Sequence, residues 1–343
     1  MYQTIGDAEF RKRLKNGFDG DTPKAYFFYG EEDYLKRSLL SETLEKLSGG
    51  DPMDRVSIDQ ASYSLSALED AIYSPPLFAA LKPVAVSLAP DDLKPAEIGD
   101  LCALLSGIGS DSLSVAVLSI PSGGFDPGLP KRPSALFKKL AEAAVPVLFE
   151  HATGARLNGW VGRHFNERGV VAPASVCAYT VYYCGSDMFR LASEIDKIAF
   201  FVKAAGRHEA TEEDVRTAGC RSEEFDSFAL ANAILSSDYP RALGILGYLR
   251  GNKVEPARIM AEITRVFCDM AAVSVCRRAG MTPEQISKET GIKPYPLSRY
   301  IKAVGGVSDS SLSRAIRLAA VADSGVKGYS RDYVPIEQFI CSL

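Results

Sequence analysis

Residues 72–88 read IYSPPLFAALKPVAVSL, and the interpretation of the whole chain is built outward from this stretch. An amphipathic segment ends here, two prolines interrupt it, and VAV at 84–86 is typical of a buried strand. Leu77 and Phe78 are adjacent, whereas residues on one face of a helix are three or four apart and those of a strand two apart. The pair therefore cannot easily enter a single core.

This adjacency leaves two interpretations of Leu77 and Phe78. An exposed Leu-Phe pair on a proline-stiffened turn would be a binding anchor, because large apolar side chains dominate the energy of protein interfaces. Alternatively, the pair packs beneath its own loop, since short apolar runs usually belong to a core.

Length and composition indicate an ordinary globular protein. The chain has 343 residues, of which 46% are hydrophobic and 24% charged, which predicts two or three domains. A formal net charge of −4 excludes a uniformly basic nucleic-acid-binding protein but not a local basic face. No apolar run reaches the roughly 18 residues of a membrane span, and the polar N-terminus predicts no signal peptide. We expect a cytoplasmic protein without a membrane partner.

Cysteines and histidines suggest neither a metal nor a nucleophilic site. The seven cysteines are an odd number without a CxxC pair, so we expect reduced, buried thiols. The three histidines are too few and too dispersed for a zinc site. No pattern supports a catalytic Cys-His pair, and we expect no metal and no cofactor.

Apolar runs at 24–29, 55–59, 83–88, 113–120 and 145–149 alternate with helical patterns. This alternation predicts an α/β domain with a parallel sheet covered on both faces. A Gly/Pro-rich loop is expected at 122–128. Strand patterns end near residue 152, and all later segments are predicted to be helical. We expect three domains: an α/β domain at 1–150, a small helical domain at 151–210 and a larger helical domain at 211–343.

Gly30 follows the first predicted strand, where a phosphate-binding loop would lie. When the pattern GxxxxGK[ST] begins at Gly30, the first glycine and Lys36 match. Leu35 replaces the second glycine, and Arg37 replaces the hydroxyl residue that would hold Mg²⁺. Three acidic residues, 31–33, would repel a triphosphate. The sequence thus places a degenerate nucleotide site here; the acidic residues are interpreted as the first turn of a helix, where they favour its dipole.

Other charged groups are interpreted as structural. Asp91 and Asp92 follow a predicted strand, where a metal-binding acid could lie, but a solvated loop or helix cap explains them better. Glu194 and Lys197 are predicted to form an exposed ion pair on a helix. The net charge is −5 over 211–240 and +6 over 241–303. Solvated helix faces explain this asymmetry, and an acidic partner or a nucleic-acid backbone is the alternative.

Taken in order, several segments resemble the delta subunit family of the bacterial DNA polymerase III clamp loader. They span nearly the whole chain, although Pro76 and the short linker at 122–128 depart from the family pattern. The segments are YFFYGEEDYL at 26–35, SPPLFAALKPVAV at 74–86, LASEIDKIAFF at 191–201, TEEDV at 211–215, FDSFALANAILSSDYPRALGILGYL at 225–249 and IRLAAVADSGVKGY at 316–329.

The resemblance implies an AAA+-like (P-loop NTPase-like) domain that has lost ATP hydrolysis, a small helical lid domain and an all-α collar domain. It places the clamp-binding element of the family on Leu77 and Phe78. It also implies a non-catalytic subunit of the DNA polymerase holoenzyme, a nucleotidyltransferase that acts in DNA replication. The implied partners are the sliding clamp (beta subunit), the gamma/tau and delta-prime loader subunits, and primed DNA through the assembled complex. Two other functions remain open at this point, an active AAA+ or P-loop ATPase and a helical scaffold unrelated to replication.

Overall fold

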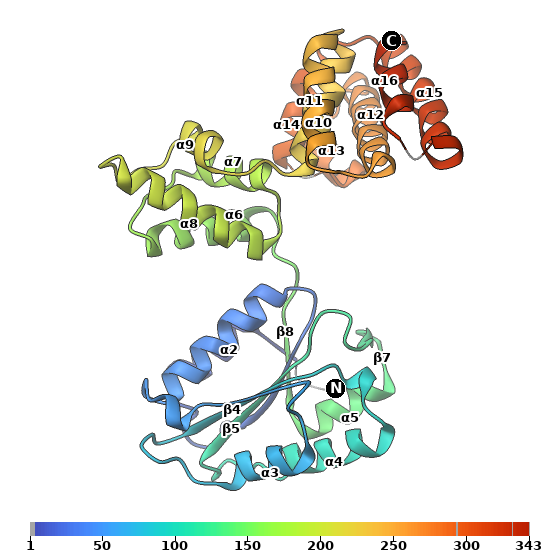
Figure 1. Ribbon diagram of the computed structural model, residues 1–343. Helices are drawn as coiled ribbons and strands as arrows, with labels where there is room; N and C mark the ends of the chain where they lie inside the picture. The colour runs from blue at the N-terminus through green and yellow to red at the C-terminus, as the bar shows by residue number, and fades with distance from the viewer. Residues whose placement is uncertain (1–3, 293, 331, 343) are drawn as a thin grey trace. The chain divides into compact units, whose positions relative to one another are not determined.

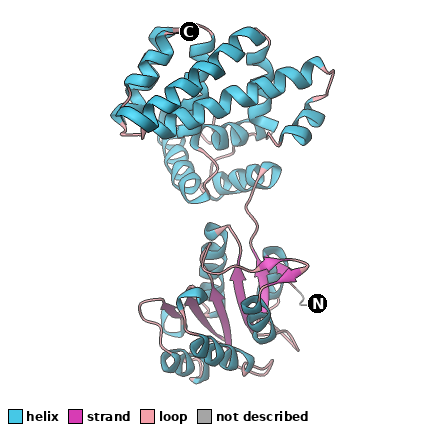
Figure 2. Cartoon of the chain, turned by 90° about the vertical axis from the view of Figure 1, so that its right-hand side faces the viewer, coloured by secondary structure: helices cyan, strands magenta, loops and turns pink. Residues whose placement is uncertain are grey.

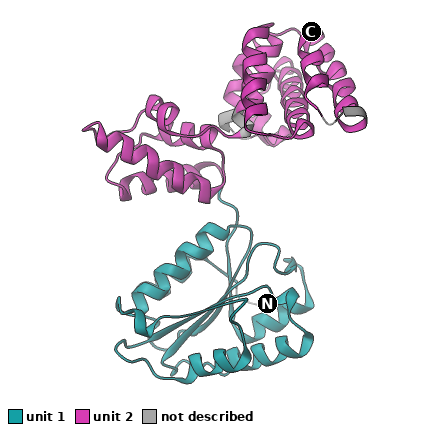
Figure 3. Cartoon of the chain, in the orientation of Figure 1, with its two compact units in different colours: residues 1–152 teal, residues 153–343 magenta. Residues whose placement is uncertain are grey.

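A parallel α/β unit is followed by an all-helical unit in a computed structural model of the chain, which describes residues 4–292, 294–330 and 332–342 (Figure 1). The two compact units comprise residues 1–152 and 153–343 (Figure 3). The further division of the helical unit near residue 210 stays a prediction.

The first unit is built on a six-stranded sheet with the strand order β1-β8-β2-β5-β4-β3, and all of its pairings are parallel. A short antiparallel pair, β6 and β7, begins at the last residue of the predicted loop 122–128 and extends beyond it. The strands are β1 (Ile5–Gly6), β2 (Ala25–Tyr29), β3 (Val56–Asp59), β4 (Lys82–Ser87), β5 (Ser114–Ser119), β6 (Gly128–Leu129), β7 (Arg132–Pro133) and β8 (Val145–Leu148).

Helices cover both faces of this sheet, with α2 on one side and α3, α4 and α5 on the other (Figure 1). The predicted α/β class with a parallel sheet is therefore confirmed. The helices are α1 (Asp7–Lys15), α2 (Asp33–Leu47), η1 (Pro52–Asp54), α3 (Leu65–Tyr73), η2 (Pro90–Asp92), α4 (Pro95–Ser106) and α5 (Ala135–Ala143).

The central strands of the sheet have no polar face, and strand β2 is an example. All five of its residues are buried, because successive side chains point to opposite, equally covered faces. Tyr26 and Phe28 meet Phe10 of α1, with ring centroids 4.9 Å apart in both pairs. Phe27 and Tyr29 belong to the core on the side of α3, α4 and α5.

In the described residues of the second unit, all regular elements are helices, apart from an isolated bridge between Val171 and Glu209 (Figure 2). Its large core is organised by α12, whose buried residues recur at helical spacing from Ile259 to Val273 and pack against α10, α14 and α15. In the described part of the chain, no helix is long and apolar enough to cross a membrane. The helices are α6 (Gly154–Glu167), α7 (Ala174–Cys184), α8 (Met188–Ala204), α9 (Glu212–Ala218), α10 (Glu223–Leu235), α11 (Tyr239–Gly251), α12 (Pro256–Arg278), α13 (Pro283–Thr290), α14 (Pro294–Val304), α15 (Asp309–Gly325), η3 (Val326–Ser330) and α16 (Val334–Cys341).

Candidate functional site

The Leu-Phe pair lies in the loop 74–81, between the end of α3 and the start of β4. Leu77 is 63% exposed and Phe78 is 70% exposed, so neither packs beneath its own loop. Because the strands are parallel, a loop that enters β4 lies at the amino-terminal edge of the sheet. The pair therefore lies at the opposite edge from Gly30, which follows the carboxyl end of β2.

A buried carboxylate that sequence reasoning missed holds this loop. Asp54 is 1% exposed and accepts hydrogen bonds from three successive backbone amides, those of Leu77 at 2.5 Å and of Phe78 and Ala79 at 2.7 Å. The bond from the Leu77 amide is the largest cause that lowers the pKa of Asp54, and nearby Lys82 adds to the effect. Asp54 ends η1, two residues before the start of β3, and β3 pairs with β4, so the sheet brings residues 54 and 77 close together.

A buried lysine holds the other end of the same loop. Lys82 is 4% exposed, and its Nζ atom donates to the backbone carbonyl of Ser74 and to Ser74 Oγ, the latter at 2.6 Å. Burial lowers the pKa of Lys82, and the negative charge of Asp54 opposes this shift. The loop is thus held at Ser74 and at 77–79 by two buried side chains of opposite charge.

The degenerate nucleotide site is occupied by side chains of the chain itself. Lys36 is 2% exposed, and its Nζ atom lies 2.7 Å from the carbonyl oxygen of Gly30, 2.6 Å from that of Ile120 and 2.7 Å from Asp33 Oδ1. Burial lowers the pKa of Lys36, while Asp33 opposes that shift. The ammonium group that would contact phosphates in an intact site is directed at protein oxygens instead.

Asp33 completes this arrangement across the carboxyl end of β5. Its carboxylate accepts hydrogen bonds from the backbone nitrogen of Ser122 at 3.0 Å and from Ser122 Oγ at 2.6 Å. Burial raises the pKa of Asp33, but the bonds from Lys36 and Ser122 outweigh it, so the net shift is downward. Only Asp33 of the three acidic residues lies in the first turn of α2, which corrects the expectation that all three do.

The other positions of the degenerate pattern have structural explanations. Leu35 is 8% exposed and belongs to the core, whereas Arg37 is exposed. Gly30 has φ +113°, and a Cβ atom there would lie 2.4 Å from the carbonyl oxygen of Phe149. Gly30 is therefore required by the close approach of β2 and β8, whether or not a ligand binds.

The other charged residues singled out in the sequence lie in two different settings, an exposed turn and a partly buried ion pair. Asp91 and Asp92 are exposed residues of η2, and no group of metal-ligating side chains occurs among the described residues. Glu194 does pair with Lys197 at 2.8 Å, but the pair is not fully exposed. Glu194 is 6% exposed and accepts a hydrogen bond from the backbone nitrogen of Cys220, because that segment packs on α8.

The cysteines are all free, but the expectation of buried thiols holds for only some of them. Cys102, Cys177 and Cys184 are buried. Cys220, Cys268 and Cys341 are exposed, so the apolar segments around them do not cover every thiol.

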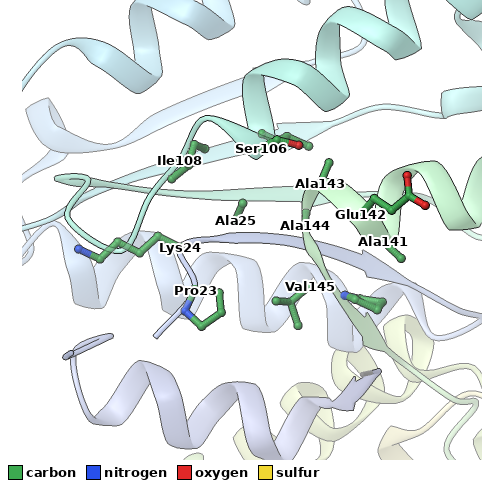
Figure 4. Close-up of a pocket in the computed structure, with 12 residues that line it drawn as sticks. Pro23, Lys24, Ala25, Ser106, Ile108, Ala141, Glu142, Ala143, Ala144 and Val145 are labelled. Carbon is green, nitrogen blue, oxygen red and sulfur yellow. The ribbon is translucent and has the colours of Figure 1, made fainter. Parts of the chain in front are cut away.

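A pocket of about 300 Å³ also lies at the amino-terminal edge of the sheet, lined by the starts of β2 and β8 and the ends of α4 and α5 (Figure 4). The Nζ atom of Lys24 at this pocket donates to the carbonyl oxygen of Ser112 at 2.6 Å. Ligands of open parallel sheets bind at the carboxyl ends of the strands, and this pocket is at the other edge.

Comparisons with known proteins find similarity to one family. The family model "DNA polymerase III delta subunit, C-terminal domain" matches residues 224–343. DNA polymerase III subunit delta of Bacillus subtilis (strain 168) is 27% identical over 151 residues, which are 44% of this chain and 43% of that protein. The match thus spans less than half the length of that relative.

A solved structure resembles the whole chain. The Bacillus subtilis DNA clamp loader delta protein (YqeN) covers 98% of both chains with a TM-score of 0.52 at 19% identity. At that identity the likeness concerns the fold alone, and it extends over both units described above. The C-terminal part of this chain is thus similar to the DNA polymerase III delta subunit family in sequence, and the whole chain is similar in fold to a clamp loader delta protein.

Proposed function

We propose that this chain is a DNA polymerase III delta subunit, which binds and opens the sliding clamp without hydrolysing ATP itself, so that the clamp can be loaded onto primed DNA. The observation that supports the proposal best is the exposure of Leu77 and Phe78, at 63% and 70%, on a loop held at both ends. Large apolar side chains that are exposed and preorganised in the free protein are suited to fill an apolar pocket of a partner.

Opening would follow from unequal affinity for two states of the clamp. A ligand shifts an equilibrium only by the difference between its affinities for the two states. If Leu77 and Phe78 dock best on a ring whose interface is distorted, their binding energy favours the open ring. ATP bound to neighbouring loader subunits would then control when the pair is accessible.

The absence of hydrolysis is proposed from the site at Gly30. Lys36 is committed to two backbone carbonyls and to Asp33, and Arg37 stands where a hydroxyl ligand of Mg²⁺ is needed. The alternative of an active ATPase predicts ATP binding there. Calorimetric titration with ATP and Mg²⁺ separates the two, because measurable binding at this site would favour the ATPase.

The partners and the cellular location are proposals of the same kind. We propose that the chain acts in the cytoplasm, in a complex with the gamma/tau and delta-prime subunits. The helical domains of those subunits would form a collar together with residues 211–343 of this chain. Primed DNA would be met by the assembled complex. Co-purification with a set of proteins that excludes the clamp and the loader subunits would instead favour a helical scaffold outside replication.

The direct test is the affinity of the full chain for the sliding clamp, compared with that of the double variant Leu77→Ala, Phe78→Ala. We expect the double variant to lose about 2–4 kcal/mol of binding free energy, as is usual when central interface side chains are truncated. A double variant that folds normally and binds the clamp as tightly as the natural chain would refute the proposal.

A further inference from the structure

Asp54 is a buried carboxylate that contacts the exposed loop 74–81. It lies outside the degenerate nucleotide-binding pattern that begins at Gly30 and outside the segments that resemble the delta subunit family. Its two oxygens accept from three successive amides, at 2.5, 2.7 and 2.7 Å. Three consecutive amides that converge on one anion form a turn like the first turn of a helix around a bound anion. Three hydrogen bonds to one buried carboxylate restrict the conformations that the turn can adopt.

The direction of these amides explains the exposure of the side chains. The backbone nitrogens of Leu77 and Phe78 are directed at a carboxylate that is itself 1% exposed, so they are directed into the domain. The side chains of the same residues are 63% and 70% exposed. Without this contact, a flexible loop could fold the apolar side chains back onto the domain surface.

The opposite end of the loop is fixed independently. Ser74 Oγ donates to the carbonyl oxygen of Asp70 at 2.6 Å in the last turn of α3, and Lys82 Nζ donates to Ser74 Oγ at 2.6 Å. Pro75 and Pro76 restrict the backbone between the two fixed points. The whole segment between α3 and β4 therefore has few ways to rearrange.

We propose that Asp54 is a positioning residue for clamp binding, whose buried carboxylate keeps the turn at 77–79 in the conformation that docks. This inference rests on the proposed role of Leu77 and Phe78. Asp54 makes no contact with the clamp in this account and acts by raising the fraction of free protein that is ready to bind. The apparent dissociation constant varies inversely with that fraction.

Binding kinetics of the full chain with the sliding clamp test the proposal. We expect Asp54→Ala to lower the association rate constant about tenfold and to leave the dissociation rate constant within about twofold, because the bound contacts are unchanged. Leu77→Ala should instead act chiefly on dissociation, since it removes a contact. Asp54→Asn retains one acceptor oxygen and should give an intermediate association rate. An unchanged association rate in folded Asp54→Ala would overturn the proposal.

Asp59→Asn is the matched control. Asp59 ends the same strand that Asp54 precedes, and its carboxylate also accepts from a backbone amide, that of Ser62 at 2.9 Å. The carboxylate of Asp59 forms its hydrogen bonds with Ser62 and not with residues 77–79. The clamp association rate of Asp59→Asn should therefore equal that of the natural chain. A loss equal to that of Asp54→Ala would contradict a specific role for Asp54.

Hydrogen exchange gives a readout that needs no clamp. In the natural chain, the amides of residues 77–79 should exchange slowly although the side chains of 77 and 78 are exposed, and in Asp54→Ala they should exchange faster while amides of β4 do not. Unprotected amides at 77–79 in the natural chain would overturn the proposal even if the Asp54 variants failed to fold. If instead the Leu77→Ala, Phe78→Ala variant binds the clamp normally, the proposed function fails, and exchange still decides whether Asp54 fixes the turn.

Discussion

The Nζ atom of Lys36 lies 2.6 Å from the carbonyl oxygen of Ile120 and 2.7 Å from that of Gly30. Lys36 thus joins the residues that follow β2 and β5, the adjacent central strands of the sheet. A lysine at this position of an intact phosphate-binding loop would contact a nucleotide, but here it closes the end of the sheet.

Lys36→Met should therefore destabilise the chain. The variant leaves two backbone carbonyls and Asp33 without their buried donor, and an unsatisfied buried polar group costs about 1–3 kcal/mol. Urea unfolding measures the loss, and Arg37→Met, which alters an exposed neighbour on α2, is the control and should stay within about 0.5 kcal/mol. If Lys36→Met kept full stability and abolished ATP binding, the lysine would be a nucleotide ligand.

Gly30→Ala should be severely destabilising. The added Cβ would lie 2.4 Å from the carbonyl oxygen of Phe149, and the backbone has φ +113°. We expect a loss of at least about 2 kcal/mol in the free energy of unfolding. Gly20→Ala separates the cost of positive φ from the cost of the close contact. Gly20 also has positive φ, at +63°, but its added Cβ would have no atom within 4 Å. Equal losses in the two variants would show that the close approach to Phe149 is unimportant.

Asp214 should make the helical unit sensitive to acid. Its carboxylate accepts from Arg207 Nη1 at 2.8 Å and from the backbone nitrogen of Thr211 at 2.9 Å, and hydrogen bonding to Arg207 is the first cause that holds its pKa well below the ordinary value. A carboxyl with a lowered pKa in the folded state stabilises the fold above its unfolded pKa of about 3.9, and this contribution is lost as the pH falls further.

The variant Asp214→Asn tests this linkage. At pH 7 it should lower the free energy of unfolding by about 1 kcal/mol through the weakened helix cap. The difference from the natural chain should shrink as the pH falls below about 4, because Asp214 of the unfolded chain then binds a proton while Asp214 of the folded chain stays ionised. Glu212→Gln, which alters an exposed ion pair with Arg216 at 3.8 Å, should have little effect at any pH. A pH-independent loss in Asp214→Asn would contradict the linkage.

Residues 25–29 and 84–86 show what the sequence could predict about the fold. Their continuous apolar runs correctly predicted the central strands and a parallel sheet, since only a sheet covered on both faces buries every residue of a strand. Strand β1 was missed, because two residues, Ile5 and Gly6, give no periodic pattern. The pair β6 and β7 was not predicted for the same reason, because each of its strands has two residues.

The site could be predicted only in part. The adjacency of Leu77 and Phe78 conflicts with any regular periodicity and so raised exposure as one of two interpretations, but the local apolar pattern favoured packing beneath the loop, and only the structure shows both side chains exposed. Asp54 was not found, since it lies 23 residues before Leu77 and its role depends on the pairing of β3 with β4. Glu194 was expected to be exposed because helical spacing identifies partners but not which helix face is covered. Its contact with Cys220 became visible only in the folded chain.

Leu77→Ala with Phe78→Ala should leave stability nearly unchanged. Both side chains are more than half exposed, so their removal creates no cavity, and the free energy of unfolding should stay within about 0.5 kcal/mol. Thermal and urea unfolding measure this. A large loss of stability would mean that the pair supports the domain, and any loss of binding in the variant could then reflect misfolding.

Release of the sliding clamp from nicked circular DNA, in the absence of nucleotide, tests the central claim most directly. A closed ring leaves circular DNA only if it opens, whereas it can slide off linear DNA unaided. The natural chain should accelerate release from the circle, and the folded Leu77→Ala, Phe78→Ala variant should not. Equal acceleration by both chains, or acceleration by neither, would contradict the account.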